Sequence, residues 1–278
     1  VLSARTDIAA TDFMSQVTAP TSPVDKAMIL RAIAVDANGA SSSVATGAYF
    51  IGYQNRASFY RDCKVVSLVT DSDNLFDYEK GIYVLGKTYD DWRNGPDYDY
   101  STRTWEMPAN YMQSGALWER PASMQIFENG SLVLSQDVGI RIHGGATRSQ
   151  NQKSFNVYAR SNYGVAKVEY DLFSGKVQSQ FNGGVIDSFD SFMLRNAGND
   201  GQYTRFRDKL NQSLVSDRNL LTQGMEPCIV FVDGEFWGHY EITEKLSDSL
   251  VKDHYGIKKK DVCLIKNEEL DEGTEEGF

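Results

Sequence analysis

The chain contains 278 residues, of which 41% are hydrophobic and 12% aromatic, so it carries enough apolar side chains for a sizeable folded core. Its formal net charge of -10 argues against a nucleic-acid-binding protein, which would present a basic face. No apolar run approaches the roughly 20 residues of a membrane span, no signal peptide is visible at the N-terminus, and the three cysteines and three histidines lack the spacing of a zinc site.

Residues 1–52 are predicted to form a small β-rich accessory module, joined by a linker at 53–64 to a larger domain at 65–278. The segments 27–35 and 44–51 have the composition of strands, and a Gly- and Ser-rich turn separates them. Further strands from the preceding residues would be needed to close a β-sandwich core. This layout resembles the chitobiase C-terminal-like, fibronectin-III-associated modules of secreted bacterial proteins, and the resemblance implies a spacer or accessory role.

The larger domain is predicted to be of the α+β class, with antiparallel hairpins. The dipeptides Asn129-Gly130 and Asp233-Gly234 each separate two strand-like runs, which is the signature of a tight hairpin turn. Residues 87–115, rich in Asp, Tyr, Asn and Gly, are predicted to form a long surface excursion.

Two helices are predicted toward the end of the chain. Thr204–Leu221 carries apolar residues at helical spacing, and Asp248–Tyr255 is followed by Gly256, a residue typical of a helix C-terminus. Alternation along the strand after Gly234 predicts two opposite faces, one of which presents Trp237, His239, Glu241 and Thr243. The acidic run Glu268–Glu276 is predicted to be a solvated loop.

The first segment whose residues are suited to ligand binding or catalysis runs from Arg141 through Gly144, Gly145 and Arg148 to Lys153. A strand enters a Gly-rich turn, and the chain returns as a strand that carries a lysine. Glycines allow backbone N–H groups to approach a phosphate closely, and Arg and Lys supply charge-assisted hydrogen bonds. A Gly-Gly hairpin with solvent-facing Arg and Lys would have the same pattern, so the segment by itself leaves both interpretations open.

Two further segments follow the first. Leu194-Arg195-Asn196 ends a strand, and the polar loop after it contains Asp200, which is suited to cap the next helix. That helix has Arg207 and Asp208 on its first turns. The third segment is the hairpin 231–245, with the sequence Val-Asp-Gly-x-x-Trp-Gly-x-Tyr followed by Glu244.

In this order the three segments resemble the CotH (spore coat protein H) family of atypical protein kinases. The likeness covers about residues 65–266 and rests on Arg-x-x-Gly-Gly…Lys-Ser-Phe, Leu-Arg-Asn…Asp with Arg-Asp-x-Leu, and Val-Asp-Gly-x-x-Trp-Gly-x-Tyr. The resemblance implies a remote protein-kinase-like fold that binds ATP with Mg²⁺ or Mn²⁺ and phosphorylates Ser or Thr of a protein substrate. It also implies an extracellular, cell-surface or spore-coat location, in a spore-coat or cellulosome-type assembly.

The resemblance also implies roles for individual residues. Lys153 corresponds to the phosphate-contacting lysine, and Arg141 and Arg148 correspond to supporting basic residues of the Gly-rich turn. Glu244 is expected on the adenine side or at the lobe junction. The remaining matches, Asp200 and the helix with Arg207 and Asp208, are expected to pack behind the nucleotide as structural support.

One departure from the family pattern bears on catalysis. The metal-binding and catalytic aspartates of the family lie in a C-terminal lobe, and no residue of this sequence matches them, so the catalytic and metal-binding residues are unassigned. Phosphoryl transfer depends on metal electrostatics and positioning, and we therefore expect this chain by itself to be inactive. If it is a front part, apolar surface should be exposed near Val262, Leu264 and Ile265.

A second function class fits some of the same residues. A secreted carbohydrate-binding or adhesion module without catalysis would use exposed aromatic side chains to stack on sugars. Candidates for that role are Trp92, Tyr98, Tyr100 and Trp105, although core packing would explain them equally well. Binding of nucleotide or of polysaccharide separates these two hypotheses.

Overall fold

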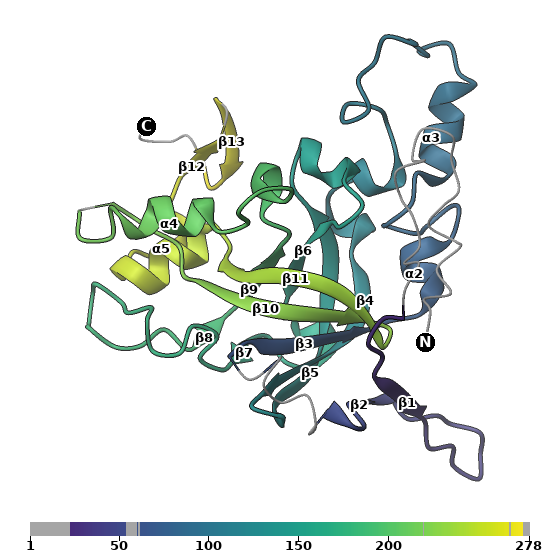
Figure 1. The fold of residues 1–278 in the computed structure, drawn as a ribbon, viewed down its shortest axis with the longest axis horizontal. Helices are drawn as coiled ribbons and strands as arrows, with labels where there is room; N and C mark the ends of the chain where they lie inside the picture. Colours follow the sequence, from purple (N-terminus) through teal and green to yellow (C-terminus); the bar gives the residue numbers. More distant parts are fainter. Residues whose placement is uncertain (1–22, 54–59, 61, 219, 267, 275–278) are drawn as a thin grey trace.

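The computed structural model describes residues 23–53, 60, 62–218, 220–266 and 268–274. At its centre, seven strands close into a barrel in the order β10-β11-β9-β6-β5-β4-β3 (Figure 1). These strands are β3 (Lys64–Val69), β4 (Arg120–Glu128), β5 (Ser131–His143), β6 (Ser154–Tyr158), β9 (Ser191–Arg195), β10 (Met225–Val232) and β11 (Glu235–Glu244). Neighbouring strands are antiparallel except β3 and β10, which run parallel and complete the closure. The structure is therefore a mixed fold with mostly strands and few helices.

The barrel interior is filled by apolar side chains from alternate positions of its strands. Ile140 and Ile142 of β5 lie in the same buried cluster as Phe155 and Val157 of β6. The cluster continues with Phe192 and Leu194 of β9 and with Tyr240 and Ile242 of β11. Because burying one such side chain contributes about 1.5–3 kcal/mol, this interior is the main source of stability.

Both predicted hairpin turns are confirmed. Asn129 and Gly130 connect β4 to β5, and Asp233 and Gly234 connect β10 to β11. All four residues have positive φ, between 48° and 81°. This is the geometry of a type I′ turn, which Asn-Gly and Asp-Gly adopt most readily.

The predicted regular alternation along β11 is wrong at Trp237. Val230 pairs with Gly238, whereas the next residue, Phe231, pairs with Phe236, so Trp237 is the extra residue of a β-bulge. The bulge turns Trp237 into the main core, where its Nε1 donates a hydrogen bond to the hydroxyl of Tyr83 at 3.0 Å. Beyond the bulge, Tyr240 lies in the core.

The predicted N-terminal strands form a hairpin that packs on the barrel. β1 (Met28–Ala32) and β2 (Ala45–Tyr49) are antiparallel. Phe50 then contacts Phe127 and Phe231 edge to face, with ring centroids 5.0 and 4.9 Å apart. The prediction of a separate β-sandwich module concerns residues 1–52, of which 1–22 lie outside the described residues, so it stays a prediction.

The predicted surface excursion at 87–115 has more structure than expected. It contains most of α3 (Gly86–Arg93) and a short 3-10 turn, Asn110–Met112. Tyr89 and Tyr111 from this segment are buried in the main core. The apolar contacts of these tyrosines therefore override a local composition that is typical of loops.

The predicted helix at 204–221 is shorter than expected. α4 spans Arg207–Ser213 only, and Phe206, Leu210 and Leu214 are exposed. By contrast, the second predicted helix is confirmed as α5 (Asp248–Tyr255), with Gly256 at φ 72°. Ahead of these, α2 (Ser72–Phe76) follows β3.

Two further two-stranded sheets complete the described structure. β7 (Val168–Glu169) pairs with β8 (Ser188–Phe189), and β12 (Leu264–Lys266) pairs with β13 (Glu269–Glu272). The acidic run is therefore partly a strand. Val262 is buried, whereas Ile265 and its partner Leu270 are each 42% exposed. No helix in the described part of the chain is long and apolar enough to span a membrane.

Candidate functional site

The three candidate motif segments of the sequence meet at one end of β6. Ser154 Oγ lies 2.8 Å from Asn196 Oδ1, and Asn196 Nδ2 donates to the carbonyl of Gln152 at 2.5 Å. Gln152 Nε2 in turn donates to the carbonyl of His239 at 2.7 Å. Arg205 Nη2 adds a bond to the same carbonyl at 2.8 Å. The strand pairing thus brings together residues that are far apart in the sequence.

Lys153 lies inside this junction, not on its surface. Its side chain is almost fully buried, and its Nζ donates to the carbonyls of Arg148 and Gln150 at 2.7 and 2.8 Å. The ammonium also lies over the rings of Tyr111 and Tyr83, at 4.0 and 5.2 Å from their centroids. Burial lowers the pKa of Lys153 to about 7.

The two predicted supporting arginines occupy different places. Arg148 belongs to the turn that encloses Lys153, and its guanidinium donates to the carbonyls of Tyr111 and Gln113. Arg141 lies on the outer side of β5, where it pairs with Glu119 at 2.7 Å. Arg148 and Lys153 are therefore neighbours, whereas Arg141 belongs to a separate ion-pair cluster.

Glu244 lies level with Val157 of β6, which is four residues after Lys153 in the sequence. Glu244 pairs with Phe192, which pairs with Val157 of β6. Its carboxylate is buried against His254 Nε2, at 2.9 and 3.1 Å, and accepts a hydrogen bond from Gly224 N at 2.7 Å. The structure thus places Glu244 with α5, away from the lysine.

Asp200 connects the polar loop after β9 to the start of α4. Its carboxylate accepts hydrogen bonds from Thr204 Oγ1 at 2.6 Å and from Arg207 N at 3.1 Å. The side chain of Arg207 approaches the same carboxylate at 3.2 Å. The hydroxyl and backbone donors hold the pKa of Asp200 below its usual value.

A row of polar side chains crosses the outer face of the barrel. His143 of β5 pairs with Ser154 of β6, and Arg195 of β9 pairs with Glu241 of β11. Ser154 precedes Phe155, which pairs with Leu194, so the four residues lie side by side on one line across four strands. An outer barrel face normally carries polar residues in contact with solvent, but Ser154 and Glu241 are each only 3% exposed.

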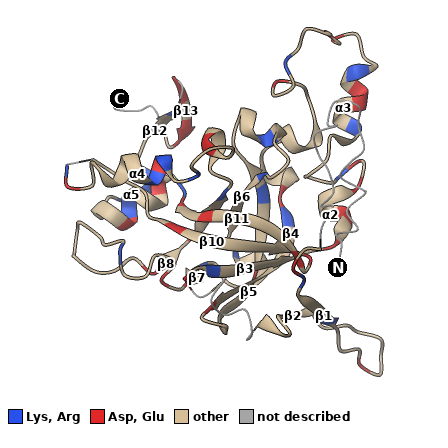
Figure 2. Cartoon of the chain, in the orientation of Figure 1, with Lys and Arg blue, Asp and Glu red and all other residues tan. Residues whose placement is uncertain are grey.

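Arg195 connects this row to α4. Its guanidinium forms an ion pair with the carboxylate of Asp208, although Glu241 is its direct partner on the next strand. Burial acts against ionisation of Asp208, but the bond from Arg195 outweighs it and keeps the pKa of Asp208 low. Figure 2 shows that α4 contains residues of both charge signs.

Cations surround the imidazole end of the row. Burial, together with Arg195 and Arg148, lowers the pKa of His143 to about 4, so this imidazole is neutral at physiological pH. Lys266 and Lys245 act in the same direction. This end of the row therefore favours anions.

Glu241 differs from Ser154 and Arg195 of the row in its hydrogen bonding. No hydrogen bond or ion pair to its carboxylate occurs among the described residues, and burial raises its pKa. Arg195, Lys209 and Asp208 lie close enough to act on it electrostatically. The oxygens of Glu241 are not among the fully buried polar atoms that lack a hydrogen-bond partner in the described residues, so they keep some contact with solvent.

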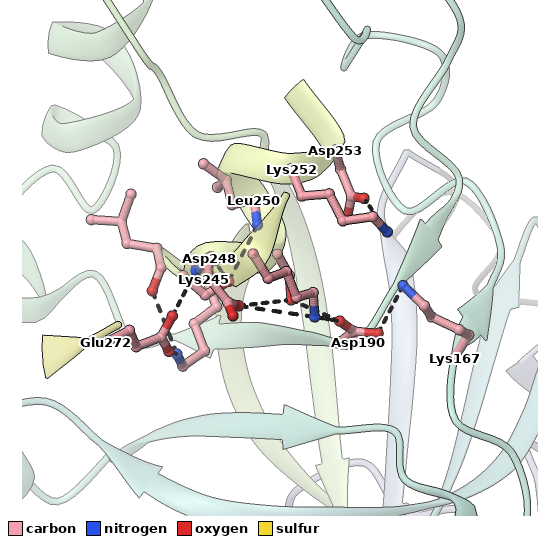
Figure 3. A network of polar contacts seen from close by, with 12 residues as sticks. Lys167, Asp190, Lys245, Asp248, Leu250, Lys252, Asp253 and Glu272 are labelled. Carbon is pink, nitrogen blue, oxygen red and sulfur yellow. Dashed lines mark hydrogen bonds and ion pairs between the residues drawn. The ribbon is translucent and has the colours of Figure 1, made fainter. Parts of the chain in front are cut away.

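A second polar network has a structural role. Asp190, just before β9, binds Lys167 at 2.7 Å, Lys259 at 2.5 Å and Ser249 Oγ at 2.7 Å (Figure 3). In the same view, Glu272 of β13 approaches Lys245 at 3.3 Å. These contacts fasten α5 and the β12–β13 hairpin to the barrel.

The comparison with protein families supports part of the expectation. Residues 140–276 match the CotH kinase protein family. The match begins in β5 and includes the junction at Lys153, the polar row, α4 and α5. No curated protein matches the chain in a direct sequence comparison.

The residues present can be tested for their fit to ATP and a divalent cation. Lys153 and Arg148 already donate to backbone carbonyls, and Arg141 pairs with Glu119. The outer face next to α4 also combines cations with carboxylates, although Arg195 and Asp208 already pair with each other and Gln212 donates to the second oxygen of Asp208. Lys209 and Glu241 lie beside this pair.

Of the residues on this face, the sequence assigned only Asp208, as structural support, and gave no role to Arg195, Lys209 or Glu241. The alternation after Gly234 placed Glu241 and Thr243 on one face, which is the one signal that was present. Nothing local in the sequence indicates that Arg195 lies opposite Glu241, or that both are covered. Cross-strand pairing supplies that information.

Proposed function

We propose that residues 140–276 form the nucleotide-binding part of a CotH-like kinase that phosphorylates Ser or Thr of a protein substrate, using ATP with Mg²⁺ or Mn²⁺. The observation that carries this proposal is the match of these residues to the CotH kinase family. The meeting of the three motif segments around Lys153 and Asn196 supports it. The proposal includes a spore-coat, cell-surface or otherwise extracellular location.

The chemistry of the outer face is compatible with phosphoryl transfer. In protein kinases a cation on a strand pairs with a carboxylate on a helix, and this pair positions the phosphates. Arg195 of β9 and Asp208 of α4 form a pair of that kind. When bound, a divalent cation would neutralise charge on the phosphate oxygens. The part of this chain is to hold and orient the phosphates.

Nucleotide binding is the direct test. Purified chain would be titrated with ATP in the presence of Mg²⁺ or Mn²⁺ by calorimetry and by thermal shift. We expect a rise in melting temperature, because a ligand at 100 times its dissociation constant stabilises the folded state by about 2.7 kcal/mol. Absence of binding with either metal would refute the proposal.

A second arm of the test addresses the alternative hypothesis. Tyr98, Tyr100 and Trp105 are exposed, as a sugar-stacking surface requires. The same preparation would be incubated with insoluble polysaccharides and sedimented. Co-sedimentation without nucleotide binding would favour a carbohydrate-binding module. Transfer of radiolabelled phosphate from ATP to a protein would separately measure catalysis.

A further inference from the structure

An open cavity of about 390 Å³ lies between α4, the start of β10 and the segment 173–180. Sites for small molecules have volumes of about 300–1,000 Å³. Among the described residues, neither the Lys153 junction nor the polar row contributes to the lining of this cavity, whereas His254 of α5 does. The cavity is therefore separate from the site considered above.

His254 presents a ring nitrogen without a partner to this cavity. The residue is only 5% exposed, and its Nε2 lies 2.9 Å from Glu244 Oε1. Because a carboxylate only accepts hydrogen bonds, Nε2 is the nitrogen that carries the proton. Nδ1 has no hydrogen bond among the described residues, yet it is not one of the fully buried atoms that lack a partner. It is therefore open to the cavity and, in the neutral ring, acts as an acceptor.

Other polar side chains of the cavity lining also have unused hydrogen-bonding capacity. The hydroxyl of Thr222 and the amides of Gln178 and Gln180 form no side-chain hydrogen bond within the described residues. The hydroxyl of Ser213 donates to the carbonyl of Leu210 at 2.7 Å and keeps its acceptor lone pairs. Donors and acceptors therefore alternate around the same space.

The charged groups of the cavity are already balanced by opposite charges of the protein. Lys176 forms an ion pair with Glu226, and the imidazole has its buried carboxylate partner. Lys209 has no ion pair in the described part of the chain, but it acts electrostatically on the nearby Glu241. A ligand with a net charge would disturb this balance. The lining therefore favours a neutral ligand with several hydroxyl groups, since each hydroxyl both donates and accepts.

We propose that this cavity binds a neutral sugar. One sugar hydroxyl donates to Nδ1 of His254, and others bind the hydroxyl of Thr222 and the amides of Gln178 and Gln180. Glu244 holds the imidazole in the orientation that presents Nδ1. The inference does not depend on nucleotide binding, and its residues differ from the exposed aromatic side chains considered above.

The test uses neutral sugars as probes. Glucose, galactose, xylose and N-acetylglucosamine would each be titrated into the purified chain, and inorganic phosphate and succinate would serve as anionic probes. Two-dimensional NMR of the backbone amides follows binding and locates it. We expect at least one sugar to shift the resonances of His254 and Gly224. The N–H of Gly224 donates to Glu244 Oε2 at 2.7 Å and therefore reports on the imidazole–carboxylate pair.

Two variants each remove one polar group from the cavity. His254→Gln keeps an amide donor for Glu244 but loses the acceptor at Nδ1, and Thr222→Val removes a hydroxyl at nearly constant shape. Each should weaken sugar binding by roughly two- to tenfold, the cost of one neutral hydrogen bond. Thr222→Val should melt like the wild type, so it tests the inference even where His254→Gln is unstable. Thr104→Val, exposed and outside the cavity, is the matched control and should bind like the wild type.

Three results would overturn the inference. The first is that no sugar binds the wild type, or that the wild type and all variants bind it equally. The second is that phosphate or succinate binds in place of a sugar, which would show an anion site. The third is that ATP displaces the sugar, because the cavity would then belong to the nucleotide. A chain that binds a sugar but no ATP would support the cavity and refute the proposed function, so the two failures are distinguishable.

Discussion

At the scale of single residues, Lys153 shows how burial changes the role expected of a charged side chain. Its donors already have two carbonyl acceptors, and two tyrosine rings enclose it. Contact with a phosphate would require the turn around Arg148 to move. In this structure Lys153 stabilises that turn.

Lys153 should give the protein a specific pH dependence. Its folded pKa is about 7, below the value of about 10.4 in an unfolded chain. Between these values the unfolded state binds more protons, so this contribution to the free energy of unfolding rises with pH. In urea unfolding from pH 7 to 9, the stability of the wild type relative to Lys153→Met should therefore increase. Parallel pH profiles would contradict this, and the exposed Lys260→Met is the control.

Asp233 provides a prediction of the opposite sign. Burial raises its pKa to about 6, above the unfolded value of about 3.9, so stability from this group is lost as pH rises through that window. Asn keeps the acceptor for Thr70 N, at 2.8 Å, and tolerates the positive φ. We expect Asp233→Asn to be more stable by about 1–2 kcal/mol at pH 7.5. The gain should shrink toward pH 4; a gain that is independent of pH would show another cause.

At the scale of elements, α5 depends on contacts outside the helix. Ser247 caps its N-terminus by accepting a hydrogen bond from Leu250 N, and Gly256 ends it. Eight residues are too few for an isolated stable helix. Asp190 supplies the attachment to the barrel through Ser249 and Lys259.

Loss of this attachment should loosen α5 selectively. Asp190→Asn is expected to destabilise the protein by about 1–2 kcal/mol, because charge-assisted bonds are lost at a partly solvated site. Its lysine and serine partners lower the pKa of Asp190 despite burial, so the difference from wild type should disappear in acid, as the carboxylate is protonated. Hydrogen exchange of α5 reports the effect. Asp253→Asn should leave this exchange unchanged.

At the scale of the whole molecule, the N-terminal hairpin and the barrel share an apolar contact. Phe50 packs on Phe127 and Phe231, and Ala48 N donates to Gln125 Oε1 at 2.6 Å. These contacts link β2 to β4 and β10. Their strength determines whether hairpin and barrel unfold together.

Phe50→Ala tests this coupling. We expect a loss of about 2–3 kcal/mol, less than for a fully buried phenylalanine, in a single unfolding transition. Calorimetry measures the number of transitions. Two transitions, of which only the first shifts, would instead support an independent module in residues 1–52. Tyr49→Ala, at a neighbouring exposed position, is the control.

The sequence alone determined those features that depend on neighbouring residues. Asn129-Gly130 and Asp233-Gly234 predicted their turns because left-handed φ is favourable for few residue types. The order of the three motif segments was likewise sufficient to identify the CotH resemblance, and residues 140–276 match that family.

Only the tertiary structure decided the features that depend on distant residues. The bulge at Trp237, the enclosure of Lys153 by Tyr83 and Tyr111, and the pairing of Arg195 with Glu241 each join separate parts of the chain. Local preferences contain no information on register or on what covers a side chain. Burial, and with it the pKa and the availability of each candidate group, is therefore set by strand pairing and packing.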